Sequence, residues 1–207
     1  MRVCEAIETR TTCRAFLDTP VSEATVKAIL KGASRAPSGG NLQPWRVWAL
    51  AGDDLAALES RVKTKIASSQ IADGPTEYLI YPPVLAEPYL SRKFTVGEAM
   101  YAAIGVTHAD MAGQMVQFTR NFEFFGAPVG LFFAIDRSMQ QGQWADLGMF
   151  MQSVMLLARE HGLHSAPLES WALWHATVRD FLDLPAELML FCGMALGWMD
   201  ADAPINL

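Results

Sequence analysis

Two short segments of the chain carry side chains that could bind a small charged ligand. The first reads R-T-T-C-R over residues 10–14, with two arginines four residues apart and two hydroxyl side chains between them. Guanidinium groups form charge-assisted hydrogen bonds with phosphate, and hydroxyls add short neutral donors. These residue types match what a phosphate site needs. Solvated arginines at the end of a helix over residues 2–9 would also explain it, and the segment alone leaves both interpretations open.

The second segment reads A-P-S-G-G-N-L-Q-P-W over residues 36–45. Its glycines allow the backbone to approach a flat ligand closely, and the asparagine and glutamine amides offer both donors and acceptors. A simple helix-to-strand connection would also contain glycine and proline. Taken by itself, the segment is therefore either a binding loop or an ordinary connection.

Several other chemistries lack the residues they need. His161 and His164 stand three residues apart, but Gly162 separates them and no cysteine is close, so we predict no metal site. The sequence contains no G-x-S-x-G, G-x-G-x-x-G or Walker A motif. No pair of carboxylates is singled out by spacing for glycoside hydrolysis.

Composition narrows the class of protein. Of the 207 residues, 51% are hydrophobic and 18% are charged, against roughly 25% charged in typical soluble domains. The net charge of −6 without a basic cluster argues against nucleic-acid binding, and no apolar run reaches the ~20 residues of a membrane span. Three cysteines without a C-x-x-C pair favour reduced thiols and a cytoplasmic protein. The excess of apolar residues predicts a partner subunit that covers them.

Helices and strands are predicted to alternate along one domain that spans residues 1–207. Hydrophobic spacing predicts helices over residues 22–35, 53–68, 98–118 with a break near Gly105, 144–161 and 177–182. Buried or alternating strands are expected over residues 45–51, 128–136, 165–169 and 187–198. The helix over 144–161 has almost no polar stripe and is expected to be covered on all sides. The alternation favours a three-layer or α+β sandwich.

In this order and spacing, the two segments resemble those of the FMN-dependent nitroreductase family, which carries R-R-S-x-R-x-F and A-P-S-x-x-N-x-Q-P-W. The likeness continues through Y-P-P at 81–83, F-F-G-A-P at 124–128, W-A-D-L-G at 144–148 and F-C-G-M-A-L-G-W at 191–198. The resemblance implies an α+β, three-layer α/β/α sandwich around a central, mainly antiparallel sheet. It also implies an intertwined homodimer that binds two FMN molecules at the subunit interface.

The resemblance further assigns residues to the site. The segment over 10–14 would hold the FMN phosphate and ribityl chain, the loop over 37–41 would reach the flavin of the opposite subunit, and a backbone N–H near Glu169 would face flavin N5. The cofactor-binding residues are then Arg10, Thr11, Thr12, Arg14, Pro37, Ser38, Gly39, Asn41, Pro167, Leu168 and Glu169. Residues expected in the acceptor pocket, or else in the core, are Tyr89, Phe124 and Phe125. Arg92 and Lys93 would add positive charge nearby.

The implied activity is that of an oxidoreductase without a catalytic side chain. It would take hydride from NADH or NADPH and reduce small aromatic acceptors, nitroaromatic or quinone-like, by a ping-pong mechanism. The alternatives are an enone reductase, a reductive dehalogenase or a flavin-fragmenting enzyme of the same fold, or a flavin-binding protein without steady turnover. Family members commonly continue beyond the D-x-D-A-P-x-N stretch at 200–206 into a basic tail. Since the sequence stops at Leu207, we expect Arg10 and Arg14 to supply the phosphate contacts.

Overall fold

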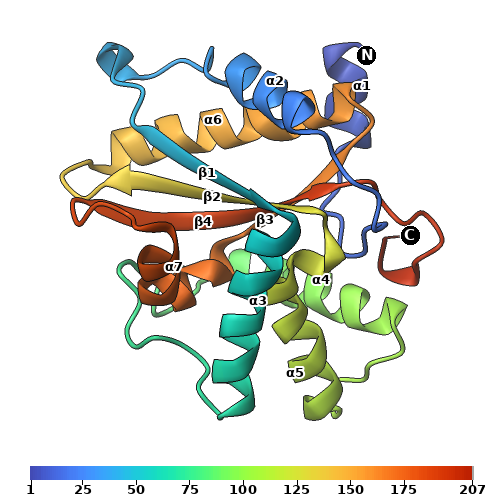
Figure 1. Ribbon diagram of the computed structural model, residues 1–207. Coiled ribbons are helices and arrows are strands. Elements are labelled where there is room, and N and C mark those ends of the chain that lie inside the picture. The colour runs from blue at the N-terminus through green and yellow to red at the C-terminus, as the bar shows by residue number, and fades with distance from the viewer. Residues whose placement is uncertain (207) are drawn as a thin grey trace.

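A four-stranded antiparallel sheet lies between two layers of helices (Figure 1). The computed structural model describes residues 1–206. The strands follow the order β1-β2-β4-β3, with bounds β1 Trp45–Ala51, β2 Val129–Asp136, β4 Leu188–Gly197 and β3 His164–Leu168. All three neighbouring pairs are antiparallel. The central strands β2 and β4 are buried along almost their whole length. The predicted α+β sandwich with an antiparallel sheet is therefore confirmed.

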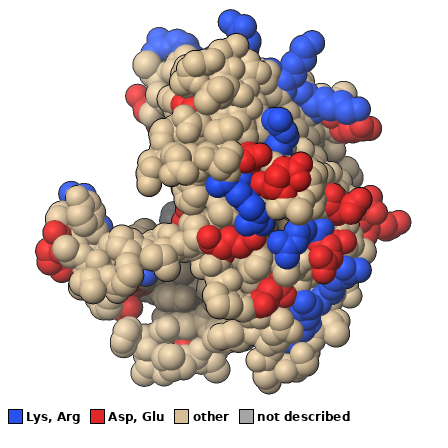
Figure 2. Space-filling view, turned by 90° about the vertical axis from the view of Figure 1, so that its left-hand side faces the viewer, with Lys and Arg blue, Asp and Glu red and all other residues tan. Residues whose placement is uncertain are grey.

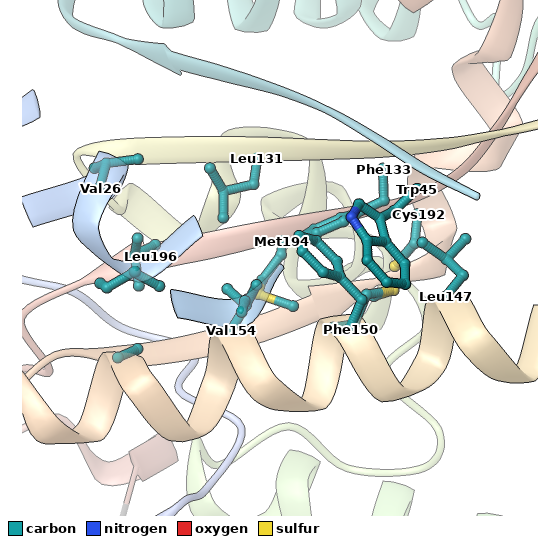
Figure 3. Close-up of a cluster of buried hydrophobic side chains, with 14 of the residues drawn as sticks. Val26, Trp45, Leu131, Phe133, Leu147, Phe150, Val154, Cys192, Met194 and Leu196 are labelled. Carbon is teal, nitrogen blue, oxygen red and sulfur yellow. The ribbon is translucent and has the colours of Figure 1, made fainter. Parts of the chain in front are cut away.

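One face of the sheet is covered by α1 (Val3–Thr9), α2 (Glu23–Ala33) and α6 (Gln141–Glu160). Apolar side chains of α2 and α6 form a core with the strands, in which Phe150 and Val154 of α6 point toward Met194 of β4 (Figure 3). The ring of Trp45 stacks on Phe150 with centroids 4.8 Å apart. Ser22 caps α2 by accepting a hydrogen bond from an N–H of the first turn, which explains why the predicted helix begins there.

The opposite face is covered by α3 (Gly52–Ala67), α7 (His175–Leu182) and the 3-10 segments η2 (Arg120–Gly126) and η3 (Glu169–Trp174). Aromatic residues dominate this second core. Phe124 stacks on Trp171 with centroids 4.8 Å apart, and Phe132 meets the same indole edge-on at 5.0 Å. A Cβ at Gly193 would lie 2.4 Å from the Trp171 ring, so only glycine lets the indole lie against β4.

Helices α4 (Tyr89–Ala103) and α5 (Met111–Thr119) pack much less tightly. No residue of α4 is buried, and large apolar side chains are exposed on both helices: Leu90, Phe94, Val96, Met111, Met115 and Val116. Figure 2 shows a mainly uncharged lobe that projects from the body of the molecule, with a hollow beneath it. The predicted break near Gly105 is confirmed, but α4 begins nine residues earlier than predicted. Pro88 occupies the N-cap position, so the prolines before it precede the helix rather than interrupt it.

The remaining elements lie close to their predicted ranges, with two short 3-10 segments in addition, η1 (Gly39–Asn41) and η4 (Pro204–Asn206). The expectation that α6 is covered on all sides is wrong for the single chain, because Met149 is 41% exposed. Only one side of α6 faces the sheet. Its apolar outer side is therefore available to another surface. Within residues 1–206, no helix is both long and apolar enough to cross a membrane.

Candidate functional site

A cavity of about 570 Å³ lies between the α4–α5 pair and the open end of β3. One wall comes from the segment before α4, from α4 itself, and from α5 with η2, and its members are Ile80, Tyr81, Met100, Tyr101, Gln117, Phe118, Asn121 and Phe125. The other wall combines Arg14 of the 10–14 segment with the end of β3 and its surroundings, and includes Met151, Pro167, Leu168, Glu169, Ser170 and Cys192. The cavity thus combines flat apolar walls with a few polar groups, as small-molecule sites do.

The segment over residues 10–14 runs along the free edge of β3. Thr12 forms a parallel bridge with Ser165, and the Cys13 N–H donates to the Ser165 carbonyl over 3.1 Å. On the other side, the Arg14 N–H donates to Oδ1 of Asn206 over 2.8 Å. The main chain of the segment is therefore held on both sides before any ligand binds.

The Arg14 side chain is half-buried and lines the cavity. Its Nη1 lies 3.4 Å from the Thr12 carbonyl, and among the described residues its guanidinium forms no ion pair. Burial lowers the pKa of Arg14, yet a guanidinium stays charged in proteins. A half-buried cation without a carboxylate partner is stabilised by a bound anion, so Arg14 provides a suitable anchor for a phosphate.

The polypeptide turns from β3 into η3 within the second wall, and we call this stretch, Pro167 to Ser170, the floor of the cavity. Glu169 lies at this junction, and burial raises the pKa of its carboxyl group. The neighbouring hydroxyl, Oγ of Ser170, is buried and has no hydrogen-bond partner within residues 1–206. The first N–H groups of a helical segment also lack partners within it. This junction therefore presents polar backbone and side-chain groups beside the flat apolar walls.

The loop before β1 is folded by its own side chains. Gln43 donates from its N–H to Oγ of Ser38 over 3.0 Å and from Nε2 to Oδ1 of Asn41 over 2.9 Å. Asn41 and Gln43 both have positive φ, 57° and 49°. The Gly39 N–H donates to Oδ2 of Asp146 over 3.1 Å, which ties the loop to the first turns of α6. The loop is therefore preformed, although most of it is exposed.

The two motif segments lie at opposite ends of α6. Asp146 holds the loop near the start of the helix, whereas Arg159 near its end donates to Oγ1 of Thr9, directly before the 10–14 segment. At the α-helical rise, these two positions on α6 are separated by roughly 20 Å. One chain therefore does not bring the two motif segments together.

The cavity unites some of the residues predicted from the sequence and not others. Those that line it are Arg14, Phe125, Pro167, Leu168 and Glu169. Arg10, Thr11 and Thr12 lie on the adjoining segment, whereas Pro37, Ser38, Gly39 and Asn41 lie at the far end of α6. Tyr89, the first residue of α4, is 59% exposed and does not line the cavity.

The acceptor-pocket prediction for Phe124 is wrong, and the structure assigns it to the core. Phe124 and Phe125 both have positive φ, 44° and 56°, so η2 turns sharply between them. The turn directs Phe124, which is 0% exposed, onto Trp171, and leaves Phe125 against the cavity. Of the two cations on α4, Lys93 places Nζ 3.9 Å above the ring of Tyr81, which lines the cavity.

Sequence reasoning missed most of the wall formed by α4 and α5. Gln117 is 6% exposed, lines the cavity, and its Nε2 has no hydrogen-bond partner among the described residues. Tyr81, Tyr101 and Asn121 also line the cavity. No local pattern marks these residues, because their helices carry apolar side chains on exposed faces as well.

The hydrogen-bond donors and the flat apolar walls of the cavity suit a planar heteroaromatic group with an anionic end. Within residues 1–206, no cluster of side chains that could hold a metal ion occurs.

Comparisons with known proteins find relatives over almost the whole length of this chain. The model of the nitroreductase family matches residues 7–198. The 4-nitrobenzoate reductase of Pseudomonas putida is 38% identical over 200 residues, which are 97% of this chain and 86% of that protein. The nitrobenzene nitroreductase of Ectopseudomonas oleovorans is 36% identical over 205 residues, which are 98% of this chain and 88% of that protein. The solved FMN and NADPH-dependent nitroreductase NfnB from Sphigopyxis sp. strain HMH has a TM-score of 0.96 at 46% identity, over 100% of this chain and 92% of its own.

Proposed function

Because this chain belongs to the nitroreductase family, we propose that it is an FMN-dependent oxidoreductase that takes hydride from NADH or NADPH and reduces nitroaromatic acceptors. The observation that supports the proposal is the cavity lined both by Arg14, whose guanidinium forms no ion pair within residues 1–206, and by the junction of Leu168 and Glu169. A cation for a phosphate and a polar backbone junction for a flat ring lie on one wall, which is the arrangement that FMN requires.

In this proposal each part of FMN has its own contacts. Arg14, with Arg10, Thr12 and the backbone of Thr11, binds the phosphate and the ribityl chain. Pro167, Leu168 and Glu169 would contact the isoalloxazine, and a backbone N–H near Glu169 would donate to flavin N5. Apolar walls from α5 and η2, including Phe118 and Phe125, keep water from the ring.

FMN supplies the redox chemistry, because its isoalloxazine ring carries two electrons between the nicotinamide and the acceptor. The chain's own residues bind and orient the cofactor and the substrates. Arg14 and the floor of the cavity hold the cofactor in place, while Tyr81, Tyr101 and Gln117 shape the space that remains. No side chain has to form a covalent bond or abstract a proton from carbon.

One cavity serves both substrates in this scheme. The nicotinamide must therefore leave before a nitroaromatic or quinone-like acceptor enters, which predicts ping-pong kinetics. Initial rates at several fixed acceptor concentrations should give parallel double-reciprocal lines. Intersecting lines would refute a shared site.

We also propose a homodimer, located in the cytoplasm. The loop over 37–41 lies roughly 20 Å along α6 from the 10–14 segment of its own chain, which supports a site where the two segments that bind one FMN come from two chains. The exposed apolar residues of α1, α6 and the α4–α5 pair are the surface that a second chain would cover. Three free cysteines fit a reducing compartment. Sedimentation equilibrium of the FMN-loaded protein should give twice the chain mass.

Anaerobic stopped-flow mixing tests the proposed activity. NADH or NADPH should bleach the visible flavin absorbance, and a nitroaromatic acceptor such as 4-nitrobenzoate should restore it. A flavin-binding protein without turnover would not be bleached. A reductase specialised for enones or halogenated substrates would be bleached but would be reoxidised slowly by nitroaromatics.

A further inference from the structure

The side chain of Asn206 joins the C-terminal turn to the segment that we assign to the FMN phosphate. We propose that Asn206 is a positioning residue for Arg14, which it holds in the orientation that grips the phosphate. This inference rests on the proposed function, and it concerns a residue outside both motif segments and outside the cavity wall.

The amide of Asn206 uses both its acceptor and its donors. Oδ1 accepts the Arg14 N–H over 2.8 Å, and Nδ2 donates to the carbonyls of Ala15 over 2.8 Å and Asp200 over 2.9 Å. Two of these bonds link residues more than 190 positions apart in the sequence. We call these three hydrogen bonds the Asn206 clamp. An amide satisfied at both ends by the main chain fixes the backbone at Arg14 and Ala15 more firmly than either bond alone.

Without the clamp, the segment would be held mainly on its other side. There Thr12 and Cys13 pair with Ser165 of β3, two residues before Pro167 and the cavity floor. The clamp holds the backbone of Arg14 and Ala15 on the opposite side. The Asp200 N–H adds a hydrogen bond there, because it donates to the Ala15 carbonyl over 3.1 Å. Arg14 therefore projects from a backbone that is fixed between β3 and the C-terminal turn.

The turn that carries Asn206 is itself well anchored. The Asn206 N–H donates to the Ala203 carbonyl over 2.9 Å, and Phe16 forms an antiparallel bridge with Met199. Element η4 also contacts α4, the helix that contributes part of the cavity wall. A long flexible guanidinium loses less entropy on binding phosphate when its backbone is already fixed. Asn206 thus contributes to phosphate affinity without touching the ligand.

Riboflavin, which lacks the phosphate, separates this role from a general effect on the fold. The full chain is stripped of flavin, and the dissociation constants of FMN and riboflavin are measured by fluorescence titration, together with the Tm of the flavin-free protein. Wild type should bind FMN more tightly than riboflavin. In Asn206→Ala the dissociation constant of FMN should rise about tenfold, while that of riboflavin changes less than twofold.

Two further variants sharpen the comparison. Asn206→Asp can still accept from the Arg14 N–H but cannot donate to the two carbonyls, so it should bind FMN as weakly as Asn206→Ala. Asp202→Asn changes an exposed side chain of the same turn and should leave both affinities unchanged. Because the clamp acts through Arg14, adding Asn206→Ala to Arg14→Ala should cause little additional loss of FMN affinity.

The outcomes are distinct. Equal losses of FMN and riboflavin affinity, or losses that add in the Arg14→Ala background, would overturn the positioning role. If Asn206→Ala prefers FMN over riboflavin by the same factor as wild type, the positioning role is also overturned, while the proposed function stays intact. If wild type binds FMN and riboflavin equally, the phosphate site in the proposed function fails, and the inference fails with it.

Discussion

Glu59 is a half-buried carboxyl group whose ionisation opposes folding. It lies on α3 and lines a small cavity of about 190 Å³ together with Lys63, Phe122 and Glu123. Burial, and secondly the charge of Glu123, raise the pKa of Glu59 from 4.5 to about 7, although Lys63 partly offsets them. Lys63 pairs with Glu123 at 3.6 Å, which leaves Glu59 without an ion pair of its own among the described residues. We therefore predict that Glu59→Gln stabilises the protein at alkaline pH.

The sign follows from proton linkage. The folded state binds the Glu59 proton more tightly than the unfolded state, so this group favours folding fully below pH 4.5 and progressively less as the pH rises through about 7. The whole shift would correspond to about 3 kcal/mol. Because the carboxyl still contacts solvent, we expect a gain of about 1–2 kcal/mol in the free energy of unfolding of Glu59→Gln at pH 8.

Urea denaturation at pH 4.5, 6, 7 and 8 measures this difference. The gain of Glu59→Gln over wild type should be near zero at pH 4.5 and should level off above pH 7. Glu187→Gln, at an exposed position, is the matched control and should show no such trend. A difference between Glu59→Gln and wild type that is the same at pH 4.5 and pH 8 would refute the reasoning, because a packing effect does not titrate.

Three further predictions concern other residues. Arg10→Ala should raise the dissociation constant of FMN roughly ten- to hundredfold by removing a charge-assisted contact, and unchanged affinity in a fluorescence titration would place the phosphate elsewhere. Gln117→Leu should raise the KM for a nitroaromatic about three- to tenfold without slowing flavin reduction by NADPH, and an equal effect on both steps would contradict a contact to the acceptor. The Asp73 side chain is 4% exposed, bonded to Lys65 at 2.8 Å and to the Thr177 N–H at 2.6 Å, so Asp73→Ala should lower the free energy of unfolding by about 3 kcal/mol in urea denaturation.

Much of the fold could be predicted from the sequence because its local signals agree with one another. The capped, periodic segment after Ser22 became α2, and the apolar runs over 128–136 and 187–198 became the two central strands. The start of α4 was missed because prolines usually end a helix, and here Pro88 precedes one. The exposed side of α6 was missed because hydrophobic spacing reports that a side chain is apolar, but does not report which surface covers it.

The sequence by itself determined the two motif segments, their order and hence the family resemblance, because each segment carries its donors and glycines within a few residues. Only the tertiary structure decided how they are used. It separated the segments along α6, divided Phe124 from Phe125 at a turn with positive φ, and brought Gln117 to the cavity. It also joined Asn206 to Arg14 across 192 positions. Contacts between residues so far apart arise from packing of the whole chain, and no local periodicity records them.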